Sequence, residues 1–89
     1  MCRNIRPLFN YDPPAGEADI RAAASQFVRK VSGFAKPSAL NQAAYDRAIE
    51  DIARATGRLL GELKTSAPAR NRESELARAH AQALVRFRR

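Results

Sequence analysis

A long stretch with the periodicity of an α-helix, residues 38–63, constrains the fold of this chain more than any other feature. Its apolar residues recur in steps of three and four, which aligns them on one side of a helix. They are Leu40, Ala44, Ala48, Ile52, Ala55, Leu59 and Leu63, with a flanking row of Tyr45, Ile49, Thr56 and Leu60. At ~1.5 Å per residue, the helix predicted over residues 39–63 would be roughly 38 Å long. We expect the rest of the chain to pack around it.

Composition limits the core that can form around this helix. The chain has 89 residues, which suits one small domain, and 45% of them are apolar, but eighteen are alanine. Alanine favours helix and buries little area, so we expect a monomer of modest stability, to which homo-oligomerisation would add. The single cysteine excludes an intrachain disulfide and fits a reducing compartment. No apolar run approaches the ~20 residues that cross a bilayer, and no signal peptide is visible, so we expect a cytoplasmic protein.

The N-terminal residues 1–15 are predicted to form a strap across the helices. Prolines at three positions prevent a continuous helix there. Leu8 and Phe9 are the expected anchors, because they are the large apolar residues at its centre.

A first helix is predicted over residues 17–32. Two acidic residues in its first turn favour the start, and Gly33 can end it in the left-handed conformation. Its expected apolar face is Ile20, Ala24, Phe27, Val28 and Val31. The short connection to the long helix predicts an antiparallel helix hairpin. Gly57, inside the long helix, is interpreted as a place where another segment packs closely, with the strap as candidate.

The C-terminal part is predicted to contain a linker over residues 64–71 and a third, basic helix over 72–86. The predicted fold class is therefore all-α: a small helical domain built on a hairpin, with a strap and a third helix. Residues 64–89 carry seven basic and two acidic side chains, a net +5 out of +7 for the whole chain. Such asymmetry favours an anionic partner, although a solvated basic tail is the simpler interpretation. The basic residues are Lys64, Arg70, Arg72, Arg78, Arg86, Arg88 and Arg89.

Nucleic acid is one such partner, and the pattern favours only weak electrostatic binding. A helix-turn-helix reader needs a turn of three or four residues and a compact recognition helix, whereas the long helix and the loose linker here fit neither requirement. Lys36 and Ser38, at the junction between the first two helices, are a second candidate anion site, because backbone amides at a helix start attract anions. The alternative is that these residues only end one helix and cap the next.

Cys2 and His80 are the residues that could carry chemistry. With the initiator methionine removed, Cys2 would combine a free amine and a thiol, and Arg3 and Arg6 would favour the thiolate. The alternative is an inert terminal thiol. His80 interrupts the apolar stripe of the third helix, which favours a partly buried packing role. One cysteine and one histidine are too few for a zinc site, and no cofactor motif occurs, so we expect no metal or cofactor.

The opening M-C-R-N-I-R-P-L-F-N and the junction R-K-V-S-G-F-A-K-P-S resemble those of a family of short bacterial proteins known as a domain of unknown function. The resemblance covers nearly the whole chain. Gly16 departs from it, because a threonine cap would be expected there. The resemblance implies a stand-alone bacterial protein and implies no activity.

These observations favour a small non-enzymatic interaction module that binds a protein or an anionic partner, the latter through the basic C-terminal helix. The alternative is a thiol-dependent enzyme or redox sensor that uses Cys2.

Overall fold

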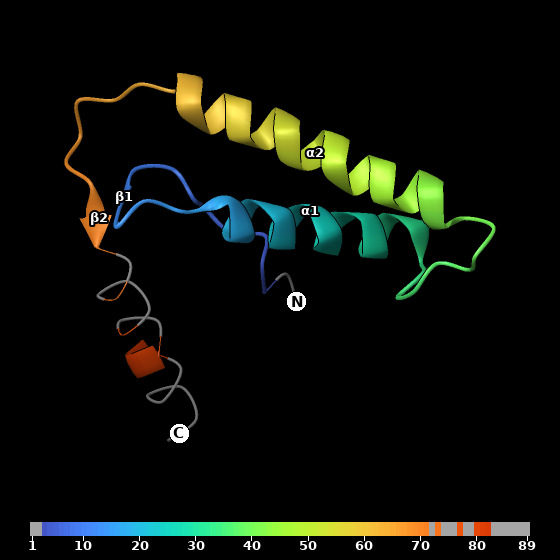
Figure 1. Ribbon diagram of the computed structural model, residues 1–89. Helices are drawn as coiled ribbons and strands as arrows, with labels where there is room; N and C mark the ends of the chain where they lie inside the picture. The colour runs from blue at the N-terminus through green and yellow to red at the C-terminus, as the bar shows by residue number, and fades with distance from the viewer. Residues whose placement is uncertain (1–2, 72, 74–76, 78–79, 83–89) are drawn as a thin grey trace.

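Two helices form the main part of the fold in this computed structural model, which describes residues 3–71, 73, 77 and 80–82. They are α1 (Glu17–Ser32) and α2 (Gln42–Glu62). Figure 1 shows α2 returning alongside α1 in the opposite direction, with the N-terminal segment crossing close to α1. The chain is mostly helical, as predicted.

Local signals account for the ends of both helices. Gly33 follows α1 in the left-handed conformation predicted for it, with φ of 80°, and its N–H donates to the Arg29 carbonyl at 2.9 Å. The start of α2 is later than predicted, at Gln42 instead of residue 39. Residues before it form a turn in which the Asn41 N–H donates to the Ser38 carbonyl at 3.0 Å, so the helix begins only after Asn41.

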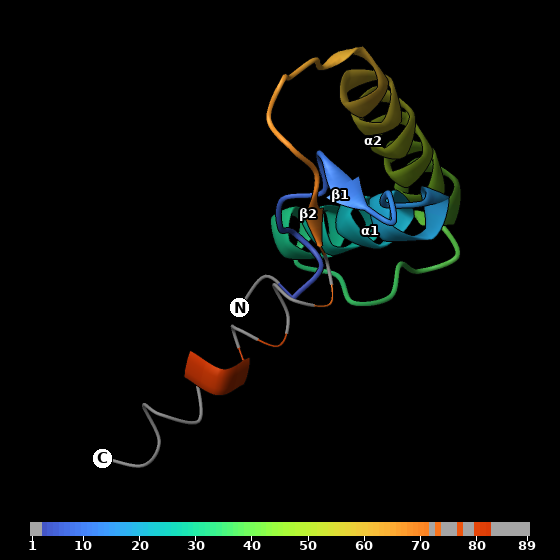
Figure 2. The ribbon, with the colours of Figure 1, turned by 90° about the vertical axis from the view of Figure 1, so that its left-hand side faces the viewer.

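A short parallel β pair was not predicted and lies partly inside the expected linker. Its strands are β1 (Tyr11–Asp12) and β2 (Arg70–Asn71), with Tyr11 opposite Arg70. Figure 2 shows the two strands side by side near the start of α1. Two-residue strands carry no periodic pattern, so sequence gave no signal for them. The pair joins the strap to the chain that follows α2.

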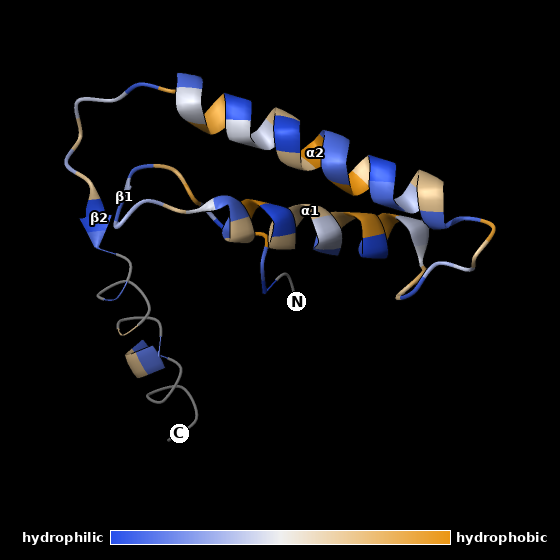
Figure 3. Ribbon diagram, in the orientation of Figure 1, coloured by the Kyte–Doolittle hydropathy of each residue, from blue (hydrophilic) through white to orange (hydrophobic). Residues whose placement is uncertain are grey.

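The buried core is small. Among the described residues, the buried apolar side chains are Leu8, Ala24 and Val28, and α2 contributes none. Figure 3 shows why: apolar positions on α2 recur between hydrophilic ones, and many of them are alanine. Leu8 acts as the predicted anchor of the strap, whereas Phe27 and Val31, predicted for the inner face of α1, are 47% and 70% exposed.

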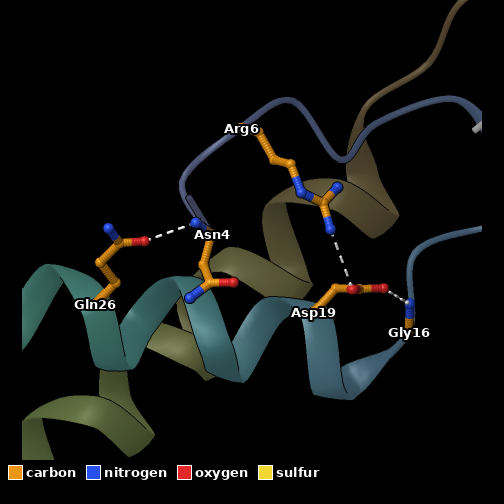
Figure 4. Close-up of polar contacts among 5 residues, drawn as sticks. All are labelled: Asn4, Arg6, Gly16, Asp19 and Gln26. Atoms are coloured by element: carbon orange, nitrogen blue, oxygen red, sulfur yellow. Dashed lines mark hydrogen bonds and ion pairs between the residues drawn. The ribbon is translucent and has the colours of Figure 1, made fainter. Parts of the chain in front are cut away.

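A polar residue, Gln26, occupies a core position that the apolar pattern did not indicate. It is only 4% exposed, and its Oε1 accepts a hydrogen bond from the Asn4 N–H at 2.7 Å (Figure 4). The strap lies on this side of α1 and covers it. A second contact nearby joins Arg6 Nη2 to Asp19 Oδ1 at 3.3 Å. The strap is therefore held on α1 by polar contacts as well as by Leu8.

Among the described residues, no ion pair joins two residues of α2. Glu50 instead pairs with Arg21 of α1, and Asp46 accepts a hydrogen bond from Gln42 at 2.9 Å. The charged face of α2 is thus partly used to join the two helices.

The strap does not pack closely on Gly57, contrary to the prediction from sequence. A Cβ built there would meet only the Ile20 Cδ1 of α1, at an ordinary contact distance of 3.9 Å. The close approach inferred for this glycine is therefore wrong.

Candidate interaction surface

An open apolar groove lies between the strap, α1 and α2. Its volume is about 260 Å³, and its lining is mostly apolar, with Arg6 and Thr56 as the polar residues. We call it the open groove and define it by Ile5, Leu8, Phe27, Ile52, Thr56 and Leu60. The strap contributes two of these residues, α1 one and α2 three, so the groove exists only when the strap is docked on the hairpin.

Large side chains at the groove remain accessible. Phe27 is 47% exposed and Ile5 is 41% exposed, although both line the groove. Folding has brought these residues together without covering them. Apolar surface of this kind costs free energy in water, at roughly 25 cal/mol per Å². Its retention in a folded chain is typical of a binding surface.

The groove was not identified from sequence. The sequence predicts apolar stripes on both helices, but it does not indicate which of their residues stay accessible. The thin packing of α2, which leaves the stripe partly uncovered, follows from how many of its apolar positions are alanine. That alanine content is the signal that indicated an incomplete core.

The predicted anion-binding residues lie at opposite ends of the hairpin. Lys36 and Ser38 are in the connection from α1 to α2, whereas Lys64 and Arg70 follow α2, near the strap (Figure 1). Both groups are exposed. They cannot form one site, because the length of the helices separates them.

The Ser38 hydroxyl is already engaged in the turn before α2. It accepts a hydrogen bond from Asn41 Nδ2 at 3.1 Å, so it stabilises the turn rather than capping a backbone amide. The same connection is fastened by Tyr45, whose hydroxyl donates to the Phe34 carbonyl at 2.9 Å. These contacts give the junction a structural role, and its role as an anion site stays a prediction.

Arg70 is held against the strap by three contacts. Its N–H donates to the Asn10 carbonyl at 2.8 Å, its guanidinium carbon lies 5.4 Å from the centre of the Tyr11 ring, and Nη1 donates to the Tyr11 hydroxyl at 3.3 Å. Asn10 adds two hydrogen bonds from Nδ2, to the carbonyls of Ala67 and Pro68, at 3.3 and 3.1 Å. Sequence did not reveal this contact, which we call the clasp and define as residues 10–12 together with 67–71.

The other predicted site residues give less information. Cys2, Arg72, Arg78, Arg86, Arg88 and Arg89 lie outside the described residues. His80 is described and exposed, so the partly buried packing role predicted for it is wrong. Most of the third helix predicted over 72–86 is also outside the described residues, although residues 73, 77 and 80–82 have helical backbone.

Within the part of the chain that the structure describes, no cluster of three or more His, Cys, Asp and Glu side chains is arranged to hold a metal ion. Neither α1 nor α2, nor any other described helical segment, has the length and apolar character needed to span a membrane.

Comparison with known proteins gives one match. The model of a family described as an uncharacterised conserved protein, DUF2277, matches residues 1–78. This match covers the strap, both helices, the clasp and the start of the basic segment. No curated protein and no solved structure matches the chain. The bacterial origin inferred from the opening and junction motifs stays a prediction.

Proposed function

Because this chain belongs to the uncharacterised conserved family DUF2277, we propose its function from its own surface: it is a non-enzymatic interaction module that binds a protein partner in the open groove. The observation that carries the proposal is the accessibility of Phe27 and Ile5 in a groove that three separate segments build. A ligand of matching chemistry is an amphipathic helix, whose apolar side chains enter a groove between helices.

The groove suits such a helix in its chemistry and its dimensions. A volume of about 260 Å³ accommodates a few large side chains, not a whole domain. The lining offers aliphatic and aromatic contacts, with the Thr56 hydroxyl as a polar group on its α2 side. Binding energy would come from apolar burial at Phe27, since aromatic residues are frequent energetic centres of interfaces.

The test is site-specific photo-crosslinking in the host cell. A photoreactive phenylalanine analogue replaces Phe27 in one variant and Leu40 in a matched control, because Leu40 is also apolar and exposed but lies in the connection away from the groove. We expect a discrete adduct with another protein from position 27 and none from position 40. Adding Thr56→Arg, which places a charged side chain in the groove, should abolish the adduct. The absence of an adduct at position 27, or one that persists with Thr56→Arg, would overturn the proposal.

A second candidate function is binding of an anionic polymer by the basic residues 64–89, and the clasp favours it. The contacts of Arg70 with Asn10 and Tyr11 hold the first part of this basic segment against the strap. A fixed origin reduces the conformational freedom that electrostatic binding must overcome. We expect single-stranded nucleic acid to bind without sequence preference and to dissociate as salt rises to about 0.5 M.

Fluorescence anisotropy with a labelled oligonucleotide measures this. Reversing Arg86, Arg88 and Arg89 to glutamate should weaken binding, while Arg29→Glu on α1, a charge reversal at an exposed residue outside this segment, should have little effect. Affinity that is independent of salt would contradict an electrostatic mechanism. Cys2→Ser should leave both kinds of binding unchanged; loss of binding would favour the thiol-dependent alternative.

A further inference from the structure

One flank of α2, beside the residues that line the open groove, carries an apolar strip that the fold covers only in part. Half-buried residues of α2, such as Ile49 and Leu60, lie on its inner side. Leu59 and Ala55 lie farther round the helix and are exposed, Leu59 by 54%. The apolar stripe of α2 is thus wider than the surface that the hairpin covers. The exposed residues of the strip are Ala44, Ala55 and Leu59, and the half-buried Ala48 and Ile52 lie at its inner edge.

Four charged residues lie beside this strip, and their charges alternate in sign along the helix. Arg47, Asp51, Arg58 and Glu62 lie along its flank, all exposed, and none of them forms an ion pair with another described residue. The midpoint of Asp51 and Arg58 falls between Arg54 and Ala55, and the midpoint of Arg47 and Glu62 falls at the same place. Each pair therefore has opposite charges at equal distances from one point on the helix.

We propose that a second copy of this chain packs on the strip, with the two α2 helices antiparallel and a two-fold axis between Arg54 and Ala55. In an antiparallel helix pair the same flank of each helix meets the other. Asp51 then faces Arg58 of the second copy, and the symmetry repeats this contact. Arg47 and Glu62 are matched in the same register. A parallel pair would instead bring opposite flanks together, so the four charged residues would lose these partners. A two-fold interface requires one surface to be complementary to itself, and this charge order meets that requirement.

The apolar residues fit the same register. Ala55 lies beside the axis, where small side chains let two helices approach closely. Ile52 of one copy comes next to Leu59 of the other, so the larger side chains pack on either side of the alanines. This arrangement covers the most exposed large residue in the middle of the strip, Leu59.

The area indicates a weak dimer. Contact along a helix of 21 residues covers on the order of 500 Å² per copy, below the ~800 Å² per partner of a standard interface. We therefore expect a dissociation constant of about 10–100 μM. The open groove shares Ile52 with the strip at their common edge, whereas Thr56 and Leu60 of the groove lie outside the strip. The inference does not rest on the proposed function.

Charge reversal tests both the partner and the register. Asp51→Arg and Arg58→Asp each replace two attractive contacts by two repulsive ones, so each variant should dimerise about tenfold more weakly than the native chain. The two variants complement each other: mixed in equal amounts, they should form a heterodimer close to native affinity. The double variant carries both substitutions, so two copies of it again place opposite charges at positions 51 and 58 of the interface. It should also dimerise. Lys30→Glu on α1 is the matched control and should not alter dimerisation.

Sedimentation equilibrium at concentrations up to about 1 mM measures these affinities, and circular dichroism shows that each variant retains its helices. Leu59→Glu should abolish dimerisation even at high salt, where the charge effects become small. A native chain that stays monomeric throughout the series would overturn the proposal. Variants that fail to associate when mixed would overturn it as well, even if the native chain dimerises, because another surface would then be responsible.

Discussion

At the scale of single residues, Gln26 shows how a polar side chain can hold the strap. It is nearly inaccessible to water, and its side-chain oxygen accepts the Asn4 N–H at 2.7 Å. A partly buried N–H that loses its acceptor costs about 1–3 kcal/mol, more than the hydrogen bond itself contributes. The main cost of replacing Gln26 is therefore that the Asn4 N–H loses its acceptor.

Gln26→Met tests this, because methionine has similar volume and provides no comparable acceptor. We expect the free energy of unfolding to fall by about 1–2 kcal/mol, measured by urea denaturation. Gln42→Met is the matched control: Gln42 is exposed and bonds only to Asp46 on its own helix, so its loss should cost at most about 0.5 kcal/mol. Equal effects of the two substitutions would show that the buried contact has no special role.

Residues with strong local preferences were predictable from the sequence, and residues with distant partners were not. The left-handed conformation of Gly33 follows from its position after a helical stretch. Gln26 gave no such signal, because its burial depends on a strap more than twenty residues away. Of the proposed groove, sequence indicated Leu8, Phe27 and Ile52 as apolar positions, but not that they would stay accessible.

At the scale of elements, the two glycines of α2 are not required by packing. A Cβ at Gly57 meets only Ile20 at 3.9 Å, and one at Gly61 meets nothing within 4 Å. Glycine inside a helix costs roughly 0.5–1 kcal/mol relative to alanine, because the unfolded chain has more freedom to lose. Within a single chain, α2 is thus less stable than its geometry permits.

Gly57→Ala and Gly61→Ala should each stabilise the protein by about 0.5–1 kcal/mol in thermal or urea unfolding. Gly33→Ala provides the contrast, because Gly33 has φ of 80° and alanine is strained there, so this variant should lose about 1 kcal/mol. If Gly57→Ala destabilises instead, the contact with Ile20 is tighter than its distance indicates.

The helices were predictable from the sequence, whereas the β pair and the exact start of α2 were not. Both long helices were predicted because periodicity and end signals agree over many residues. The β pair was not, since two residues are too few for a pattern and the partner strand is far away in sequence. The three-residue error at the start of α2 has a similar cause: the turn at Ser38–Asn41 resembles a helix start until its hydrogen bonds are known.

At the scale of the whole molecule, the clasp joins the strap before α1 to the segment that follows α2. Asn10 is central to it, with a left-handed backbone, φ of 63°, and two side-chain hydrogen bonds to the segment after α2. Asparagine accepts this conformation more readily than most residues. The residue therefore serves both the turn in the strap and the attachment of the C-terminal segment.

Asn10→Ala should release residues 67–71 without unfolding the helices. We expect amide exchange at Arg70 to become about tenfold faster, with α1 and α2 protected as before, measured by hydrogen exchange and NMR. Asn10→Gly, which keeps the backbone conformation but loses the hydrogen bonds, should have a smaller effect. Asn4→Ala is the control, because Asn4 contacts Gln26 through its backbone. Unchanged exchange in Asn10→Ala would show that the β pair alone holds the segment.

The clasp also has a consequence for the order in which the protein folds. Its hydrogen bonds join residues 57 to 60 positions apart, whereas the ion pair between the helices spans 29. Closing the longer loop costs more entropy and is repaid by only a few exposed contacts. The hairpin should therefore assemble first and the clasp last, once the strap is in place. On unfolding, the clasp would open first, so the basic segment could detach from a chain whose helices are still folded.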